Sequence, residues 1–252
     1  MIKINNKNLN KLIYISTMKE IVGIKNNYKK KLTDLLFIND QKDSLVKNTI
    51  NFINNKNFSN VLLWGEKGMG KSSLVHAVID DLINKDYKGL HFLEVLSHDI
   101  KYLPEIIYKL SSIKKKFIVF IDDVIFKPFS NDFNILKSVL EGSLLSSNKN
   151  ITYYFTTNMR NISLSSNQTD LDDLEKKDIQ NSIFSLSERF GICLGFYRCS
   201  KDEYLQIINN YSKSFQIKED ISADALSWSI LKGGYSGRIA FQFFMDYFNR
   251  RR

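Results

Sequence analysis

The sequence predicts an α/β fold in which a parallel sheet carries helices on both faces. Three observations predict it: short apolar segments alternate with segments of helical periodicity, two apolar runs end abruptly in polar residues, and a third breaks into a glycine-rich turn followed by a helix. Strands that alternate with helices are typical of a parallel sheet, because each helix returns the chain to the starting edge. Residues 199–252 show helical patterns only and predict a small helical lid behind the sheet.

The composition is that of a globular protein with a positive charge. The 252 residues suffice for one large α/β domain or for a medium domain with a small one, and 43% of them are hydrophobic. The formal net charge of +9 makes polyanions such as nucleic acid plausible partners. A bias toward Ile, Asn and Lys, typical of AT-rich coding, explains the same excess of lysine without a binding surface, so nucleic acid stays an open alternative.

We expect a cytoplasmic protein without membrane contact. No apolar stretch approaches the roughly 20 residues of a membrane span, and the beginning of the chain lacks a secretory apolar core. The cysteines, Cys193 and Cys199, do not have the spacing of zinc ligands. We interpret both as buried thiols in a reducing compartment.

The first elements follow from periodicity. Residues 1–31 are polar and weakly patterned, so we expect a loosely ordered arm or a covering helix there. A helix is expected over residues 43–55, where apolar side chains recur at helical spacing, and a short buried strand over residues 60–64. From Leu74 to Ile83 apolar pairs recur four residues apart, which predicts an amphipathic helix.

The remaining elements alternate in the same way. We expect strands over residues 90–95, 117–123, 151–158 and 192–197, and helices over residues 103–110 and 133–144. The lid begins with a capping box, Ser200 with Glu203, and its last two helical patterns are separated by Gly233 and Gly234.

The glycine-rich turn has the pattern G-x-x-x-x-G-K-S, from Gly65 to Ser72, between a strand and a helix. Such a turn directs backbone N–H groups at phosphate oxygens, and the helix that follows adds its positive dipole end. Lys71 would supply a charge to the β- and γ-phosphates, and the Ser72 hydroxyl a ligand to Mg²⁺. We therefore expect ATP and Mg²⁺ as ligands of Gly65, Glu66, Lys67, Gly68, Met69, Gly70, Lys71, Ser72 and Ser73.

Polar residues at other strand ends complete the candidate site, because ligands of such sheets bind at the carboxyl ends of the strands. Asp122 is expected to hold Mg²⁺ through water, and Asp123 to orient or deprotonate the attacking water. Asn158 could hold that water or the γ-phosphate. Arg189 and Arg238 can stabilise charge on a transferring phosphoryl group, although either one alone is as readily explained by a surface ion pair.

The order of these motifs, from the phosphate loop through "FIDD", "TTN", "SERFG" and "SGR", resembles that of AAA+ ATPases. More closely, "NVLLWGEKGMGKSSLVHAV", "LEGSL", "SLSERFG" and "SGRIAFQF" look like the bacterial AAA+ family called domain of unknown function 815, over roughly residues 30–252. The resemblance implies a three-layer P-loop NTPase sandwich with a helical lid. Its parts would be an N-terminal arm (1–31), a nucleotide-binding α/β domain (32–198) and the lid (199–252).

The resemblance also implies roles for the site residues. Lys71 and Ser72 would be the Walker A pair, and Asp122 the magnesium-side acid. Asp123 would be the catalytic acid and Asn158 sensor 1. Arg189 would be the arginine finger and Arg238 sensor 2. Most AAA+ proteins carry Glu where this chain has Asp123, so we expect slow turnover or a differently placed water.

The expected function is ATP hydrolysis that drives remodelling of an unknown protein partner by a homo-oligomer. An ATP-gated binding switch with little turnover is one alternative. A DNA-directed helicase or loader is another, because "SERFGICLGFY" is similar to the Holliday-junction branch-migration helicases, but a recognisable DNA-reading element is missing. A small-molecule kinase would share the loop without requiring both arginines.

Overall fold

The described residues form one eight-stranded sheet with the order β1-β3-β2-β5-β6-β7-β4-β8. The computed structural model describes residues 2–5, 9–25, 30–85, 87, 89–141, 149–158, 181–182 and 184–250. Strands β5, β6, β7, β4 and β8 pair in parallel, which confirms the predicted parallel sheet. The strands are β1 (Lys3–Asn5), β2 (Lys11–Ile15), β3 (Glu20–Gly23), β4 (Val61–Gly65), β5 (Leu90–Val95), β6 (Lys116–Ile121), β7 (Ile151–Thr156) and β8 (Ile192–Phe196).

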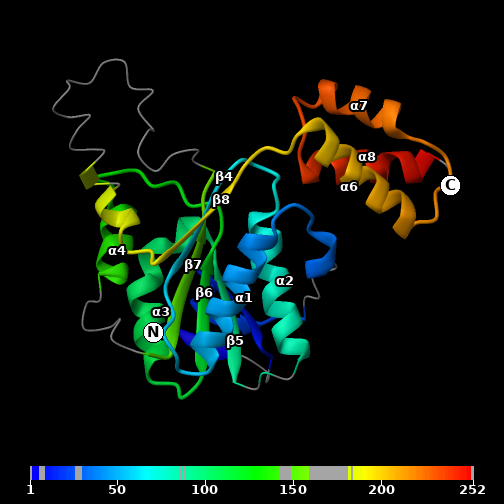
Figure 1. Ribbon diagram of the computed structural model, residues 1–252. Helices are drawn as coiled ribbons and strands as arrows, with labels where there is room; N and C mark the ends of the chain where they lie inside the picture. The colour runs from blue at the N-terminus through cyan, green and yellow to red at the C-terminus, as the bar shows by residue number, and fades with distance from the viewer. Residues whose placement is uncertain are drawn as a thin grey trace.

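Helices cover both faces of this sheet, so the predicted three-layer sandwich is confirmed (Figure 1). One face is covered by α1 (Asn39–Ile53) and α2 (Lys71–Asn84), and the other by α3 (Leu103–Ser111) and α4 (Asn131–Leu140). Residues 142–144, where the sequence extends the helix now seen as α4, lie outside the described residues. Two short 3₁₀ helices, η1 (Leu32–Asp34) and η2 (Ser97–Tyr102), precede α1 and α3.

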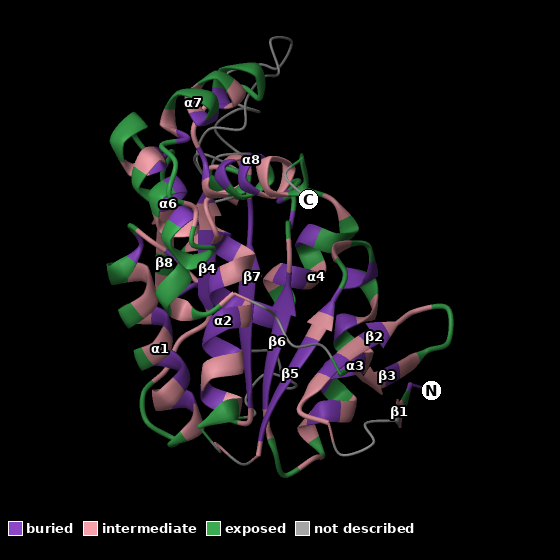
Figure 2. Cartoon of the chain, turned by 90° about the vertical axis from the view of Figure 1, so that its right-hand side faces the viewer, coloured by how far each residue is buried: buried purple, intermediate pink, exposed green. Residues whose placement is uncertain are grey.

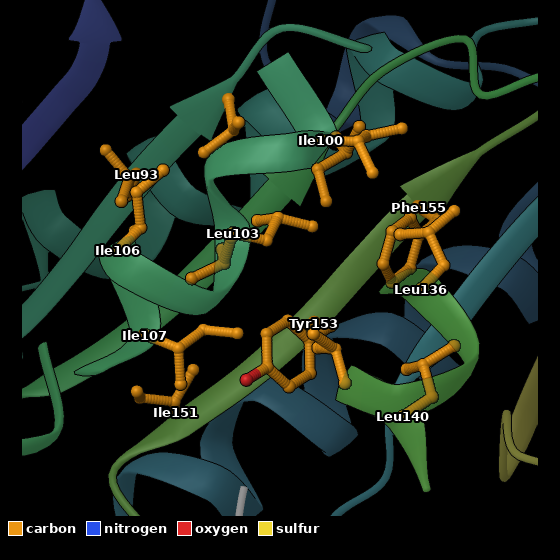
Figure 3. Packing of buried hydrophobic residues seen from close by; sticks show 14 of the residues in the cluster. Leu93, Ile100, Leu103, Ile106, Ile107, Leu136, Leu140, Ile151, Tyr153 and Phe155 are labelled. Atoms are coloured by element: carbon orange, nitrogen blue, oxygen red, sulfur yellow. The ribbon is translucent and has the colours of Figure 1, made fainter. Parts of the chain in front are cut away.

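The sheet separates two hydrophobic clusters. In the cluster of Figure 3, side chains of α3 and α4 pack on the strand β7, from which Tyr153 and Phe155 point toward them. The other cluster joins α1 and α2 to the opposite side of the same strands. The central strands are therefore buried on both faces (Figure 2), which explains why residues 117–121 form an uninterrupted apolar run.

The structure contradicts the expected arm or covering helix at the N-terminus. Strands β1, β3 and β2 extend the sheet beyond β5, with Leu12 of β2 beside Leu93 of β5. Side chains of β2 alternate between buried and half-buried, and Leu12 and Tyr14 enter the core. The strands have only three to five residues each and are separated by polar residues, so the period-two signal is short.

The lid consists of α6 (Lys201–Ser214), α7 (Ser222–Leu231) and α8 (Gly237–Arg250), which pack around a hydrophobic cluster of their own (Figure 1). Residues 197–200 connect it to β8. The predicted capping box is confirmed: the Ser200 N–H donates to Glu203 Oε2 at 2.7 Å, and the Glu203 N–H donates to Ser200 Oγ at 3.2 Å. This box fixes where the lid begins.

None of the helices in the described part of the chain is both long and apolar enough to cross a membrane. Cys199 is buried as expected, whereas Cys193 is exposed, because it lies on the edge strand β8.

Candidate functional site

A cavity of about 490 Å³ opens between the carboxyl ends of the strands and the lid. Its volume lies within the range of about 300–1,000 Å³ that is common for small-molecule sites. Most of the predicted site residues line it, although they come from four separate parts of the sequence. They are residues 67–73 of the glycine-rich loop, Asp122, Asp123, Asn158 and Arg238.

The glycine-rich loop begins and ends at glycines that the backbone requires. Gly65 has a φ of 114°, and a Cβ there would lie 2.2 Å from the carbonyl oxygen of Phe196 in β8. The next residue, Glu66, donates its N–H to that same oxygen at 2.8 Å. Gly70 has a φ of 96° and is the N-cap residue of α2. The loop is therefore fixed against β8 at its start and against a helix N-terminus at its end.

Lys71 lies at the inner wall of the cavity with only 6% of its surface exposed. Its Nζ donates to the carbonyl oxygens of Gly65 at 2.9 Å and Glu66 at 2.7 Å, and to Asn158 Oδ1 at 2.9 Å. Burial lowers the pKa of Lys71 to about 8, against the opposing attraction of Asp123. The Lys71 ammonium is thus buried and hydrogen-bonded to neutral oxygens, so it would be stabilised by an anion that enters the cavity.

Hydroxyl and amide groups connect the two aspartates to the loop and to β7. Ser72 Oγ donates to Asp122 Oδ1 at 2.6 Å, and Thr156 Oγ1 donates to the same oxygen. The Asp123 N–H donates to Thr156 Oγ1 at 2.8 Å, and Asn158 Nδ2 donates to Asp123 Oδ1. These contacts join the ends of β6 and β7 to the first turn of α2. The contacts of Thr156 with both aspartates were not predicted from the sequence.

The donors near Ser72 and Asp122 fit a Mg²⁺ ion that arrives with a phosphate ligand. Mg²⁺ prefers oxygen ligands and is commonly bound by one or two side chains, substrate phosphates and water. Within the described ranges, no group of three or more His, Cys, Asp or Glu side chains is arranged to hold a metal ion by itself. A phosphate-bearing ligand would therefore complete the coordination.

The lid touches the glycine-rich loop directly. The Arg238 N–H, in the first turn of α8, donates to the Gly68 carbonyl oxygen at 3.0 Å. A Cβ on Gly68 would lie 3.0 Å from both Arg238 Cβ and Ser236 Oγ. The Arg238 side chain also lines the cavity.

The other end of the cavity was not predicted. Residues of the segment before α1 and of two lid helices line it: Lys30, Asp34, Leu35, Leu36, Ile38, Ile207, Tyr211 and Phe241. Lys30 Nζ lies 4.9 Å from the centre of the Phe241 ring, and burial lowers the pKa of Lys30. These residues come together only through tertiary packing, since each has an ordinary place in a helix or loop. The one sequence signal is the position of residues 30–38 directly before the helix that precedes the loop.

Arg189 lies apart from this arrangement. Its Nη2 is 2.5 Å from Glu141 Oε1 at the end of α4, and it does not line the cavity of its own chain. Its Nε is buried and has no hydrogen-bond partner among the described residues. The side chain is 28% exposed, so part of it remains accessible from outside the chain.

A family model with the description "Protein of unknown function (DUF815)" matches residues 7–251. A search of curated proteins found no match. Among solved structures, a RuvB variant of Thermotoga maritima is similar with 17% identity and a TM-score of 0.56, over 85% of this chain and 63% of that one. The Aeropyrum pernix ORC1 protein in complex with DNA is similar with 13% identity and a TM-score of 0.60, over 88% and 65%.

A third similar structure is the HORMA:CdnC:Trip13 complex of E. coli MS115-1, with 13% identity and a TM-score of 0.51, over 84% of this chain and 89% of that one. This chain thus spans less than two thirds of the RuvB and ORC1 chains. At these identities the similarity shows the fold alone, and that fold agrees with the order of motifs in the sequence. The chain therefore belongs to the family described as "Protein of unknown function (DUF815)" and has the fold of the AAA+ P-loop ATPases.

Proposed function

We propose that the chain is an AAA+ ATPase that binds ATP with Mg²⁺ in the cavity and hydrolyses it to ADP and phosphate. One observation carries the proposal: the desolvated ammonium of Lys71 faces the same cavity as the hydroxyl–carboxylate pair of Ser72 and Asp122. A triphosphate would supply the anionic oxygens that this ammonium lacks. It would also accept from the N–H groups of the loop.

The two ends of the cavity suit the two ends of a nucleotide. The glycine-rich loop and the aspartates would take the phosphates, while Leu35, Ile38, Ile207 and Tyr211 offer an apolar and aromatic surface to the base. Bound Mg²⁺ would neutralise charge on the β- and γ-phosphate oxygens. Ser72 can donate its proton to Asp122 while its lone pairs remain available to the metal.

Hydrolysis requires a group that orients or deprotonates water, and we assign this role to Asp123. Asn158 Nδ2 donates to Asp123, and Asn158 Oδ1 accepts from Lys71. A phosphate that draws Lys71 Nζ away would therefore leave Asn158 Oδ1 available to the ligand or to water. We assign Asn158 to the γ-phosphate or the attacking water, and Arg238 to the phosphates from the lid. Asp123 is shorter than the usual Glu, which favours slow turnover. A nucleotide-gated switch is therefore the second candidate.

We further propose that the active form is a homo-oligomer in which Arg189 reaches the nucleotide of a neighbouring subunit. Support comes from its position, since it does not line the cavity of its own chain and its guanidinium pairs with Glu141 among the described residues. The proposed setting is the cytoplasm, with residues 32–198 as the nucleotide-binding domain and 199–252 as the lid. The remodelled partner would be a protein. The net charge of +9 and the DNA named with the ORC1 structure favour DNA as the alternative.

The deciding experiment measures ATP binding and hydrolysis by the purified chain, followed by a pull-down with Asp123→Asn. This variant is expected to retain ATP and hence its partner, because Asp123 has no role in holding the phosphates. Absence of Mg²⁺-dependent ATP binding by the unaltered chain would refute the proposed function. Capture of DNA instead of protein would favour the helicase or loader alternative.

A further inference from the structure

Thr156 is the last residue of β7, and its side chain contacts both aspartates of the site. It is only 1% exposed. Its Oγ1 donates to Asp122 Oδ1 and accepts the N–H of Asp123 at 2.8 Å. One hydroxyl thus connects the expected magnesium-side acid to the expected water-orienting acid.

The direction of each hydrogen bond follows from the groups involved. The N–H of Asp123 can only donate, so the oxygen of Thr156 must accept there. The hydroxyl has one proton, and the ionised Asp122 carboxylate can only accept it. Ser72 donates to the same Oδ1 at 2.6 Å. Two hydroxyls therefore orient this carboxylate from opposite elements, α2 and β7.

Thr156 also restrains the backbone that carries the second acid. Asp123 has a φ of 55°, a left-handed conformation that costs a residue other than glycine about 1 kcal/mol or more. The Val124 N–H donates to the carbonyl oxygen of Thr156 at 2.8 Å. Thr156 thus binds two successive N–H groups, one with its side chain and one with its backbone. In this conformation the Asp123 carboxylate accepts from Asn158.

We propose that Thr156 is a positioning residue that sets both acids for the metal–nucleotide complex, an inference that rests on the proposed function. Without the hydroxyl, Asp122 would lose one of its two orienting donors, and the N–H of Asp123 would lose its acceptor. The expected consequence is a site that binds phosphate through the glycine-rich loop but gains little from Mg²⁺. Loss of a group that orients a metal ligand commonly costs about 10- to 100-fold in metal affinity or activity.

The test uses Thr156→Val, which keeps the shape of the side chain and suits a β-strand. We expect the affinity for a fluorescent ATP analogue to be within about twofold of the unaltered chain in EDTA. The additional affinity gained in Mg²⁺ should fall about 10- to 100-fold, and turnover with it. Thr156→Ser keeps the hydroxyl and should restore most of the Mg²⁺ effect.

Thr152→Val is the matched control, because Thr152 lies on the same strand and is equally buried but contacts Ser59 and Asn60. It should leave the Mg²⁺ effect unchanged. An unaltered Mg²⁺ effect in Thr156→Val would overturn the inference while leaving the proposed function intact, whereas an unaltered chain that binds no nucleotide would overturn both. If thermal denaturation shows that Thr156→Val is unfolded, Thr156→Ala replaces it in the same comparison.

Discussion

Replacing Lys71 by Met should remove nucleotide binding and, with it, a defined dependence on pH. The Lys71→Met side chain is unbranched and suits the first turn of α2, so the fold should persist. A unit charge about 4 Å from a phosphate, at an effective dielectric constant of about 20, contributes about 4 kcal/mol. Lys71 must give up its contacts with Asn158 and two carbonyl oxygens to reach a phosphate. We therefore expect a net loss of about 100- to 1,000-fold in affinity.

The pH dependence follows from the lowered pKa of Lys71, about 8 in the nucleotide-free chain. The protonated fraction falls from about nine-tenths at pH 7 to about one-tenth at pH 9. Because phosphate binds the protonated form, binding takes up a proton and the affinity of the unaltered chain should fall about tenfold over this interval. In Lys71→Met, the affinity for ATP should not show this tenfold fall between pH 7 and pH 9.

Stability should change in the opposite direction. The unfolded state binds the Lys71 proton up to the usual pKa of 10.5, so between about pH 8 and pH 10.5 it binds more protons than the folded chain. The free energy of unfolding of the nucleotide-free chain should therefore rise with pH in this window, less steeply in Lys71→Met.

Fluorescence titrations with an ATP analogue at pH 7 and pH 9, with denaturant unfolding at the same pH values, measure both effects. Lys47→Met is the control, since Lys47 is exposed on α1 and outside the cavity. The reasoning would be refuted by an affinity of the unaltered chain that stays constant from pH 7 to pH 9. A Lys71→Met variant that binds within threefold of the unaltered chain would refute the role of the charge.

Three further predictions test the acid, the finger and the loop. Asp123→Asn should bind ATP normally in a fluorescence titration but release little phosphate, because binding and chemistry use different groups; equal turnover would favour the switch. Specific activity should rise with protein concentration, since an arginine supplied by a neighbouring subunit can contribute about 10³–10⁵ in rate. For the same reason, a mixture of inactive Arg189→Ala and Lys71→Ala chains should recover phosphate release. If the mixture stays inactive, Arg189 is left as a structural ion pair. In thermal denaturation Gly65→Ala should destabilise the chain by more than Gly89→Ala, because both have a positive φ but only Gly65 faces a backbone oxygen at 2.2 Å; equal losses would exclude close approach as the reason for Gly65.

The parts of the fold that the sequence predicted are those with a strong local signal. The strand β6 is apolar from Phe117 to Ile121 because both of its faces are buried, and α6 begins at a capping box formed by two hydrogen bonds between Ser200 and Glu203. Strands β1 to β3 were missed because β2 joins them to the central sheet by pairing with β5, about eighty residues later in the chain. A strand of three to five residues is too short for its sequence alone to show the period-two pattern, so it can be identified only from the strands with which it pairs.

The candidate site divides in the same way. The glycine-rich loop and the aspartates were predicted because each follows a recognisable strand. The apolar end of the cavity depends on how α6 packs beside residues 30–38, which no local pattern encodes. Thr156 stands in the "TTN" motif, but its contacts with both acids depend on the register between β6 and β7, where Ile121 lies beside Phe155.

The glycine-rich loop is hydrogen-bonded to β8 at its start and to the lid helix α8 at its tip, so the lid would take part in the binding equilibrium of any ligand that the loop holds. At the start of the loop, the Glu66 N–H donates to the carbonyl oxygen of Phe196, the last residue before the connection to the lid. At the tip of the loop, the Gly68 carbonyl oxygen accepts from the Arg238 N–H in the first turn of α8. A rotation of the lid would therefore act on the loop through the contact between Arg238 and Gly68, while Phe196 holds the start of the loop to the sheet. By thermodynamic reciprocity, a partner that favours one lid orientation must change nucleotide affinity by the same factor by which nucleotide changes the affinity for that partner. A partner that binds the outer surface of the lid would thus have an affinity that depends on whether the loop holds nucleotide, without contacting the nucleotide itself.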